Sequence, residues 1–205
     1  MNVYSEPSDN PATPLDAVCV FCGSSGRVAE RHRKAASRFG QILGENGITL
    51  VFGGGRVGLM GLCADAAVAA GGKAVGVIPR ILHEVEVAHQ NLTELHIVET
   101  MHERKKLMFD RSDAFVVLPG GVGTLDETFE IITWRQLRLH DKPIIVVDEG
   151  GYWAPFVSMV DHIVASGFAG ERTRQLFQVV KSVEDVLPAL AASPAPKLAA
   201  HPEKL

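Results

Sequence analysis

Two short stretches of the chain combine residue types that could act on a phosphorylated sugar. The first, LPGGVGTLDE (118–127), places a glycine-rich turn directly before Asp126 and Glu127. Bare backbone N–H groups at the start of a helix bind anions such as phosphate. A carboxylate nearby can stabilise the positive charge that develops on a sugar when its C1′–N bond breaks. We therefore interpret the turn as a phosphate site and Glu127 as the acid that acts on the sugar.

The second stretch, ETMHERKKLMFDRSD (99–113), supplies cations. It predicts a helix that begins near Thr100, with Arg104 and Lys105 in its first turns and directed toward the glycine turn. A charge run of this kind is often only a solvated helix face, and we accept that interpretation for Lys106 and Arg111. The T-x-x-E spacing of Thr124 and Glu127 likewise has a plain structural alternative, a helix capping box.

Short apolar segments alternate with helical patterns and must position these residues. Strands are expected at 17–21, 48–52, 73–78, 94–98, 114–118 and 143–147, and helices at 28–44, 58–71, 101–111, 124–139 and 152–166. A short strand within 176–180 and a helix at 183–190 follow. The strands read as buried on both faces. Regular alternation predicts an α/β fold, a Rossmann-like doubly wound parallel β-sheet with helices on both faces.

Glycines concentrate where three of these strands end, at 22–26, 52–58 and 119–123. Because ligands bind beyond the carboxyl ends of parallel strands, three such loops favour a nucleotide or sugar phosphate over tight turns alone. Gly53, Gly55 and Gly58 also match the dinucleotide pattern G-x-G-x-x-G. The next strand ends in VIPR (77–80), without the acid that holds a ribose in that motif, so we reject a nicotinamide enzyme.

Length and composition indicate one soluble globular domain. The chain has 205 residues, a net charge of −4 and 46% hydrophobic residues. These values argue against general nucleic-acid or membrane binding, and the N-terminal residues are unlike a signal peptide, which makes the cytoplasm the expected compartment. The expected domain covers 16–193, between mobile tails at 1–15 and 194–205.

The cysteines and histidines show no metal or redox pattern. Cys19 and Cys22 form a C-x-x-C, but within a strand they face opposite sides and are expected to be structural. Five histidines lack ligand spacing, so no metal site is expected; they are His83, His89, His96, His102 and His140.

The pair MHERK (101–105) and PGGVGTLDE (119–127) resembles the paired motifs of the Lonely Guy (LOG) family, the cytokinin riboside 5′-monophosphate phosphoribohydrolases that are often mislabelled as lysine decarboxylases. The resemblance covers roughly 17–190 and includes CGSS, FGGGRVGLMG and ITWRQLRLHDKPI. It implies a homodimer with active sites near the subunit interface. It also implies hydrolysis of an N-glycosidic bond without a metal or cofactor, with release of the base and ribose 5-phosphate.

The same resemblance implies that Arg104 and Glu127 are catalytic. The substrate-binding positions that it implies are Glu86, Lys105, Gly120, Gly121, Val122, Gly123, Thr124, Leu125, Asp126 and Thr133. The chain departs from many relatives at Asp126, where they carry glutamate, and at Val122, often tyrosine in plants. These departures affect the expected ribose contacts and the shape of the base pocket.

Elementary chemistry limits the roles of the two catalytic candidates. Glu127 near a helix start is expected to remain ionised. Arg104 cannot release its proton, so it would fix the phosphate, orient Glu127 or neutralise the departing purine. The resemblance implies cytokinin ribotides as the substrates, with AMP as a second candidate. The alternative is a non-catalytic nucleotide carrier or sensor; lysine decarboxylation would need a pyridoxal phosphate site for which the lysines offer no evidence.

Overall fold

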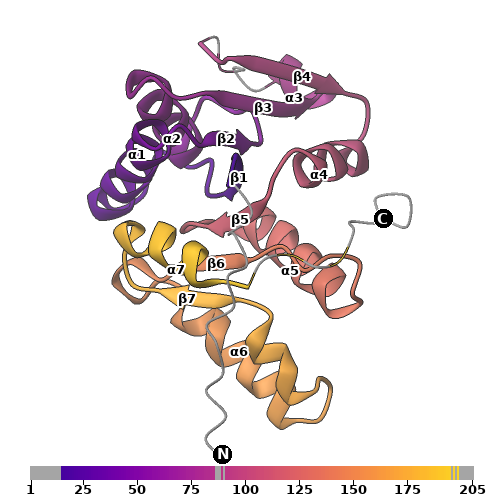
Figure 1. Ribbon diagram of the computed structural model, residues 1–205. Coiled ribbons are helices and arrows are strands. Elements are labelled where there is room, and N and C mark those ends of the chain that lie inside the picture. Colours follow the sequence, from indigo (N-terminus) through magenta and orange to yellow (C-terminus); the bar gives the residue numbers. More distant parts are fainter. Residues whose placement is uncertain (1–14, 86–88, 90, 195, 197, 199–205) are drawn as a thin grey trace, which may run out of the picture.

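The computed structural model describes residues 15–85, 89, 91–194, 196 and 198, and it contains one seven-stranded sheet. All neighbouring strands are parallel, in the order β4-β3-β2-β1-β5-β6-β7 (Figure 1). The strands are β1 (Ala17–Phe21), β2 (Thr49–Phe52), β3 (Ala74–Pro79), β4 (Glu94–Val98), β5 (Ala114–Val117), β6 (Ile144–Val147) and β7 (Gln178–Val180). The predicted doubly wound parallel sheet is confirmed.

The chain order reverses between β1 and β5, which lie side by side in the middle of the sheet. Successive strands from β1 to β4 extend toward one edge, and those from β5 to β7 extend toward the other. In sheets of this kind the reversal opens a crevice beyond the carboxyl ends of the two central strands. The glycine loops after β1 and β5 both leave the sheet at that point.

Helices cover both faces of the sheet because successive strand residues point to opposite sides. Val18 and Val20 belong to one apolar cluster, and Cys19 and Phe21 to the other. The first cluster is formed with α1 (Glu30–Glu45), α2 (Gly58–Ala69) and α7 (Val186–Ala192). The second is formed with α4 (Met101–Asp110), α5 (Val122–Gln136) and α6 (Ala154–Ala165).

Short helical segments complete the described chain. They are α3 (Arg80–Val85), which the sequence reading missed, and three 3₁₀ segments, η1 (Glu149–Gly151), η2 (Glu171–Gln175) and η3 (Val183–Asp185). The predicted segment 183–190 is therefore η3 followed by α7, and the other predicted helices and strands are found within a few residues. The predicted tails lie mostly outside the described residues.

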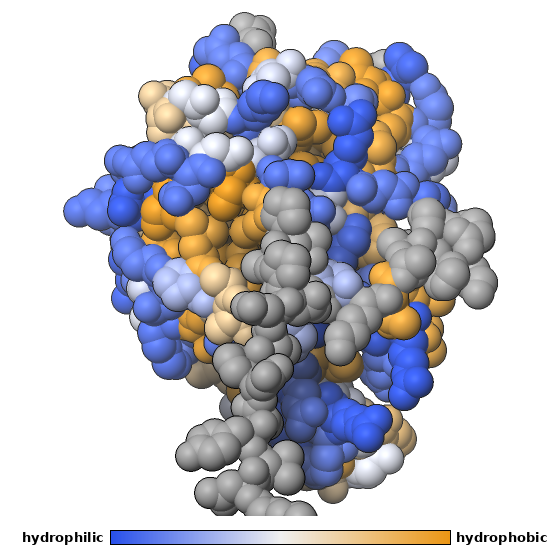
Figure 2. All heavy atoms as spheres, in the orientation of Figure 1, coloured by the Kyte–Doolittle hydropathy of each residue, from blue (hydrophilic) through white to orange (hydrophobic). Residues whose placement is uncertain are grey.

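One prediction about the strands is wrong. β4 is not buried on both faces: Glu94 and Ile97 are exposed. The reason is its position, since β4 forms one edge of the sheet and only β3 pairs with it. On the face seen in Figure 2, hydrophilic residues alternate with patches of hydrophobic residues.

None of the helices in the described parts of the chain is both long enough and apolar enough to cross a lipid bilayer.

Candidate active site

The loops after β1, β2 and β5 meet at the carboxyl end of the sheet, as predicted. The N–H of Gly23 donates to the carbonyl oxygen of Pro119 (3.0 Å), and the N–H of Leu59 donates to the carbonyl oxygen of Gly23 (2.9 Å). Gly23 thus ties the third loop to the start of α2. Backbone contacts of the first loop therefore join it to both of the others.

The second loop uses its glycines for close packing. Gly58 has a φ of +73°, and a Cβ there would lie 2.3 Å from the carbonyl carbon of Ser24. A Cβ on Gly53 would lie 2.0 Å from Nη2 of Arg104. The close approach of loop to loop therefore requires glycine at Gly58, and the lack of a side chain at Gly53 makes room for the guanidinium. Phosphate binding is not needed to explain these two glycines.

The third loop leads into α5, whose first turn has no side-chain cap. The helix begins at Val122 with Gly121 as N-cap, and no side chain caps it. The first N–H groups of a helix have no partner within the helix, so those of the first turn of α5 remain available to an anion. The alternative of a capping box between Thr124 and Glu127 is wrong, because the helix starts two residues earlier than predicted.

Gly120 allows the Thr124 side chain to fold back over the turn. A Cβ on Gly120 would lie 2.1 Å from the Oγ1 atom of Thr124. Thr124 is buried, whereas Gly121, Val122 and Gly123 are exposed. In the open part of the turn only Val122 carries a side chain, and the Thr124 hydroxyl lies against Gly120.

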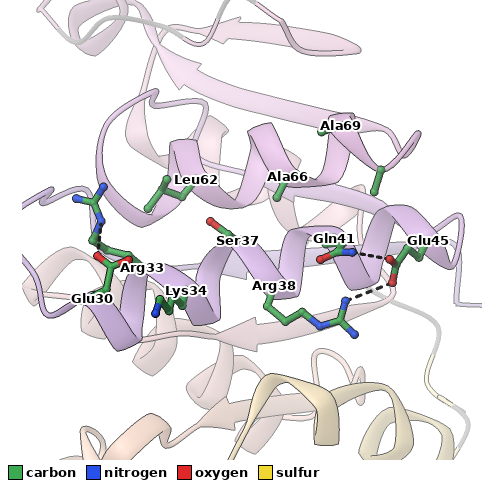
Figure 3. Close-up of a pocket in the computed structure, with 11 residues that line it drawn as sticks. Glu30, Arg33, Lys34, Ser37, Arg38, Gln41, Glu45, Leu62, Ala66 and Ala69 are labelled. Carbon is green, nitrogen blue, oxygen red and sulfur yellow. Dashed lines mark hydrogen bonds and ion pairs between the residues drawn. The ribbon is translucent and has the colours of Figure 1, made fainter.

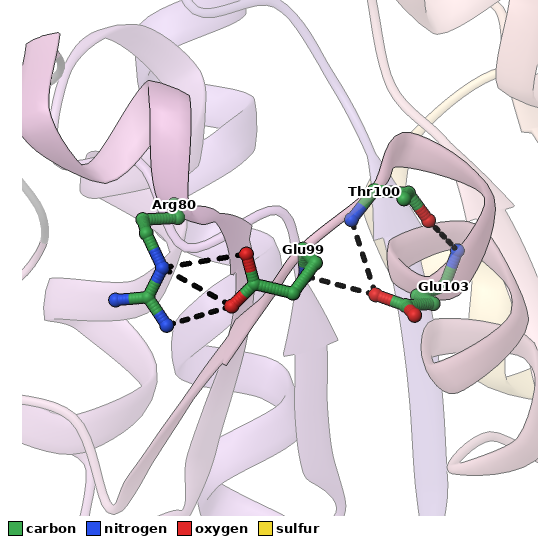
Figure 4. Close-up of polar contacts among 4 residues, drawn as sticks. All are labelled: Arg80, Glu99, Thr100 and Glu103. Carbon is green, nitrogen blue, oxygen red and sulfur yellow. Dashed lines mark hydrogen bonds and ion pairs between the residues drawn. The ribbon is translucent and has the colours of Figure 1, made fainter.

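A capping box at the start of α4 positions Arg104, and it is a feature that the sequence reading missed. The Thr100 side chain accepts from the N–H of Glu103 (3.1 Å), and Oε2 of Glu103 accepts from the N–H groups of Glu99 (2.8 Å) and Thr100 (3.1 Å) (Figure 4). The T-x-x-E spacing of Thr100 and Glu103 could have revealed it. Arg80 makes a bidentate contact with the Glu99 carboxylate, with a shortest distance of 2.7 Å, and so joins the ends of β3 and β4.

Arg104 and Glu127 form an ion pair that is largely excluded from solvent. Nη1 of Arg104 lies 3.4 Å from Oε1 of Glu127, and each side chain is 11% exposed. Nε of Arg104 donates to the carbonyl oxygen of Val77 (3.1 Å), which fixes the plane of the guanidinium. The structure thus brings together the two residues that were predicted to be catalytic.

Burial changes the protonation of Glu127. Loss of solvent raises the pKa of Glu127 from 4.5 to about 7, and the attraction of Arg104 is the strongest opposing influence, followed by that of Lys105. The expectation that Glu127 stays fully ionised is therefore wrong near neutral pH. In a helix that begins at Val122, Glu127 lies beyond the first turn, where the helix dipole has little effect.

Lys105 points to the neighbouring helix and contacts its acidic face. Its Nζ atom lies 2.7 Å from Asp126 and 3.4 Å from Glu130. Burial alone would lower the pKa of Lys105, but the hydrogen bond to Asp126 and the charge of Glu130 raise it. Lys106 and Arg111 pair with carboxylates at the surface, Asp110 and Glu94, in agreement with the solvated role predicted for them.

The remaining predicted site residues are less closely grouped. Leu125 is half-buried, and Asp126 is exposed on the same helix face as Thr133, which is also exposed. Glu86 lies outside the described residues. The structure therefore assembles the glycine turn, Arg104, Lys105 and Glu127 at one place, and Thr133 lies about two turns further along α5.

We predict that Gly53→Ala raises the pKa of Glu127 above about 7. The new methyl group would occupy the place of the Arg104 guanidinium, and its displacement would weaken the attraction that opposes burial. The stability cost should be small, because the end of a flexible side chain can move aside. An NMR titration of the Glu127 carboxyl carbon measures the shift. Gly26→Ala, where a Cβ meets nothing within 4 Å, is the control and should leave the titration unchanged.

A surface groove of about 800 Å³ lies elsewhere, between α1 and α2 (Figure 3). Its charged side chains include Arg33 and Arg38, which pair with Glu30 and Glu45, and its apolar wall includes Leu62 and Ala66. It contains none of the motif residues.

Among the described residues, no three or more His, Cys, Asp or Glu side chains are arranged to hold a metal ion. Cys19, Cys22 and Cys63 are buried free thiols, and burial raises the pKa of each. The structural role predicted for Cys19 and Cys22 agrees with this.

Comparison with known proteins connects this geometry to a family. A family model described as "Possible lysine decarboxylase" matches residues 60–190. A cytokinin riboside 5′-monophosphate phosphoribohydrolase of Rhodococcoides fascians is 41% identical over 189 residues, which cover 88% of this chain and 96% of the relative. A protein of the same name from Arabidopsis thaliana is 40% identical over 178 residues, which cover 83% and 84% of the two chains.

Solved structures with low sequence identity share the fold. The molybdenum cofactor binding protein of Rippkaea orientalis has a TM-score of 0.66 at 18% identity, covering 87% of this chain and 97% of the other. The molybdenum cofactor carrier protein of Chlamydomonas reinhardtii also has a TM-score of 0.66 at 18% identity, covering 86% and 96%. At this identity the similarity concerns the fold alone.

Proposed function

This chain belongs to the Lonely Guy family of phosphoribohydrolases, and on that premise we propose that it hydrolyses the N-glycosidic bond of cytokinin riboside 5′-monophosphates. The products are the free base and ribose 5-phosphate. The observation that carries the proposal is the buried Arg104–Glu127 pair beside an uncapped, glycine-rich helix start. A carrier would gain little from a carboxylate near a bound phosphate.

The phosphate end of the substrate is assigned to the turn at 120–124. N–H groups of this turn and the Thr124 hydroxyl supply donors for the monoester oxygens, and the start of α5 adds a favourable dipole. Binding energy from the phosphate orients the sugar and contributes away from the reacting carbon. The nucleoside without phosphate is therefore a much poorer substrate.

The reacting end of the substrate is assigned to Glu127. The C1′–N bond breaks, a water oxygen forms the new bond to C1′, and a water proton ends on the base. The ionised Glu127 carboxylate stabilises the positive charge on the sugar or orients the water. Arg104 keeps its proton, holds Glu127 in place and favours its ionised form.

The other substrate contacts rest on the family resemblance. Lys105 is placed to balance the charge of Asp126 while that carboxylate contacts the ribose. We assign Glu86 and Thr133 to the base end of the substrate on the resemblance alone. Val122 is exposed, and it stands where the resemblance implies that plant members often carry tyrosine, so we propose a differently shaped base pocket.

Lysine decarboxylation, the activity in the description of the family model, finds no support in the lysines of the site. A Schiff-base lysine needs a depressed pKa, because its neutral amine must attack. The pKa of Lys105 is raised instead by its carboxylate partners. Lys106 pairs with Asp110 at the surface of α4.

A homodimer is the proposed assembly. Several exposed apolar residues lie on or next to the elements around the site, where a second copy would cover them; they are Ile81, Ile97, Met101, Val122 and Leu137. Because they come from α3, β4, α4 and α5, an interface there would lie beside Arg104 and Glu127. This placement fits the interfacial active sites that the resemblance implies.

Incubation with isopentenyladenine riboside 5′-monophosphate and with AMP, followed by chromatography, tests the proposed function. We expect free base and ribose 5-phosphate from the cytokinin nucleotide, and we keep AMP as a second candidate substrate. The matched nucleosides should react far more slowly. Nucleotide binding without base release would instead indicate the carrier or sensor alternative, and equal rates with and without phosphate would contradict the phosphate site.

A further inference from the structure

Tyr152 contacts the glycine turn from a segment outside both motifs. It follows η1, and its hydroxyl donates a hydrogen bond to the carbonyl oxygen of Gly120, with 2.6 Å between the oxygens. Its ring packs edge-on against the rings of His32 and Trp153, with centroid distances of 5.4 and 4.9 Å. The two ring contacts therefore hold the ring in place, and the hydroxyl forms a hydrogen bond with the turn.

The hydrogen bond to the Gly120 carbonyl also sets the direction of the Gly121 N–H group, because both groups belong to one planar peptide. The described chain has no cis peptide bonds, and in a trans peptide the C=O and N–H groups point in opposite directions. A carbonyl of Gly120 that faces Tyr152 directs the N–H of Gly121 away from Tyr152. Among the residues that the structure describes, that N–H has no acceptor.

The preceding peptide is held in the same way. The carbonyl oxygen of Pro119 accepts from the N–H of Gly23 at 3.0 Å, so the N–H of Gly120 also points away from its anchor. Two consecutive peptide planes are thus fixed through their carbonyl groups. Consecutive N–H groups in such a turn can bind one anion together.

Such anchoring matters because only the flanking peptides of the turn are held by the backbone. Pro119 accepts from Gly23, and Gly121 accepts from the N–H of Leu125 (3.0 Å). Among the described residues, the Gly120–Gly121 peptide between them has no hydrogen bond other than the one from Tyr152. Gly120 and Gly121 lack side chains, and a Cβ on Gly121 would meet nothing within 4 Å. Glycine loses more conformational freedom on ordering than any other residue, and a mobile donor binds more weakly than a fixed one. An external hydrogen bond to Gly120 reduces that cost before the ligand arrives.

We propose that Tyr152 is a positioning residue that recognises no substrate itself but holds the Gly120–Gly121 peptide so that the Gly121 N–H faces the bound phosphate monoester. The inference rests on the proposed function only in taking a nucleoside 5′-monophosphate as the ligand. It adds a third segment, after β6, to a site otherwise formed by the two motifs.

Tyr152→Phe tests the inference because it removes the hydroxyl and keeps the ring. Loss of one such hydrogen bond should raise the Kd for AMP and for ribose 5-phosphate about three- to tenfold. The KM for the nucleotide should rise equally while kcat stays within about twofold. The Kd for adenosine should not change, since adenosine carries no phosphate monoester. Calorimetry and steady-state base release provide the two measurements.

Ser193→Ala is the matched control. It removes another hydroxyl-to-carbonyl hydrogen bond, to Ala189 at 2.9 Å, just beyond the end of α7. It should leave all three ligands unaffected.

Unchanged AMP binding by Tyr152→Phe would overturn the inference, as would equal weakening of AMP and adenosine. No binding of AMP or ribose 5-phosphate to the unmodified protein would overturn it too, because the turn would then hold no monoester. Failure of the proposed function would give a different result. The unmodified protein would then release no base, but Tyr152→Phe would still bind AMP more weakly than Ser193→Ala does.

Discussion

Replacing Glu127 with glutamine is expected to lower the rate of base release at least about a hundredfold while AMP still binds. The amide has nearly the same size and can still contact Arg104, but it carries no charge to stabilise the sugar cation. Steady-state kinetics and calorimetry separate the two effects. Glu45→Gln, at the exposed end of α1, is the matched control and should retain turnover within about twofold.

The same variant should change how stability depends on pH. The folded protein binds the Glu127 proton more tightly than the unfolded chain, because burial raises the pKa from 4.5 to about 7. The stabilising contribution of this proton is fully present below pH 4.5 and is lost as the pH rises through about 7. At about 1.4 kcal/mol per pKa unit, the loss amounts to about 3 kcal/mol.

Glu127→Gln has no such proton, so its stability relative to the unmodified protein should rise by about 3 kcal/mol between pH 4.5 and 8. Denaturant unfolding of both proteins at several pH values measures the difference, in which the other titrating groups cancel. A constant difference across this range would contradict the raised pKa. Full turnover in the variant would remove Glu127 from the chemistry.

Replacing Arg104 with methionine is expected to have the second large effect, again at least about a hundredfold on turnover. Methionine keeps an unbranched side chain but removes the strongest attraction that opposes protonation of Glu127. The pKa of Glu127 should therefore rise above 7, and the pH at which activity reaches its plateau should rise with it. The phosphate of the substrate titrates equally for both proteins, so the displacement of the profile is diagnostic.

The free energy of unfolding of Arg104→Met should also depend on the protonation of Glu127. At pH values above the raised pKa of Glu127 the variant carries a buried carboxylate without its partner, a situation that typically costs about 3–5 kcal/mol. Near pH 5 Glu127 is protonated and the cost is smaller, because a neutral acid needs no cation. A double variant with Glu127→Gln should lose this pH dependence, and a double-mutant cycle measures the coupling.

Arg111→Met is the control for the second prediction. Arg111 is the C-cap residue of the same helix, α4, and it pairs with Glu94 at 3.3 Å. Both side chains of that pair are nearly half exposed. Exposed pairs contribute about 0–1 kcal/mol, so little change is expected. Equal effects of Arg104→Met and Arg111→Met would contradict a special role for Arg104.

The parts of the site that could be predicted were those with local signals. The alternation of apolar strands and helices was enough for the doubly wound sheet, and it placed both motifs at the ends of strands. The helix start near Thr100 was correct, and its capping box could have been read from T-x-x-E. The same spacing at Thr124 and Glu127 was misleading, because α5 begins at Val122. A local pattern can fit two helix starts, and packing of the turn selects one.

By itself the sequence determined the fold class and the family, and it selected Glu127 and Arg104 as the candidate acid and arginine, because these inferences depend on residue types and on spacing along the chain. Only the tertiary structure decided that Glu127 is nearly removed from solvent, that Gly53 makes room for the Arg104 guanidinium and that Tyr152 reaches Gly120. Each of these facts joins residues more than 20 positions apart. Desolvation and hydrogen bonding depend on which atoms are neighbours in space, and that is settled only when the whole sheet has packed.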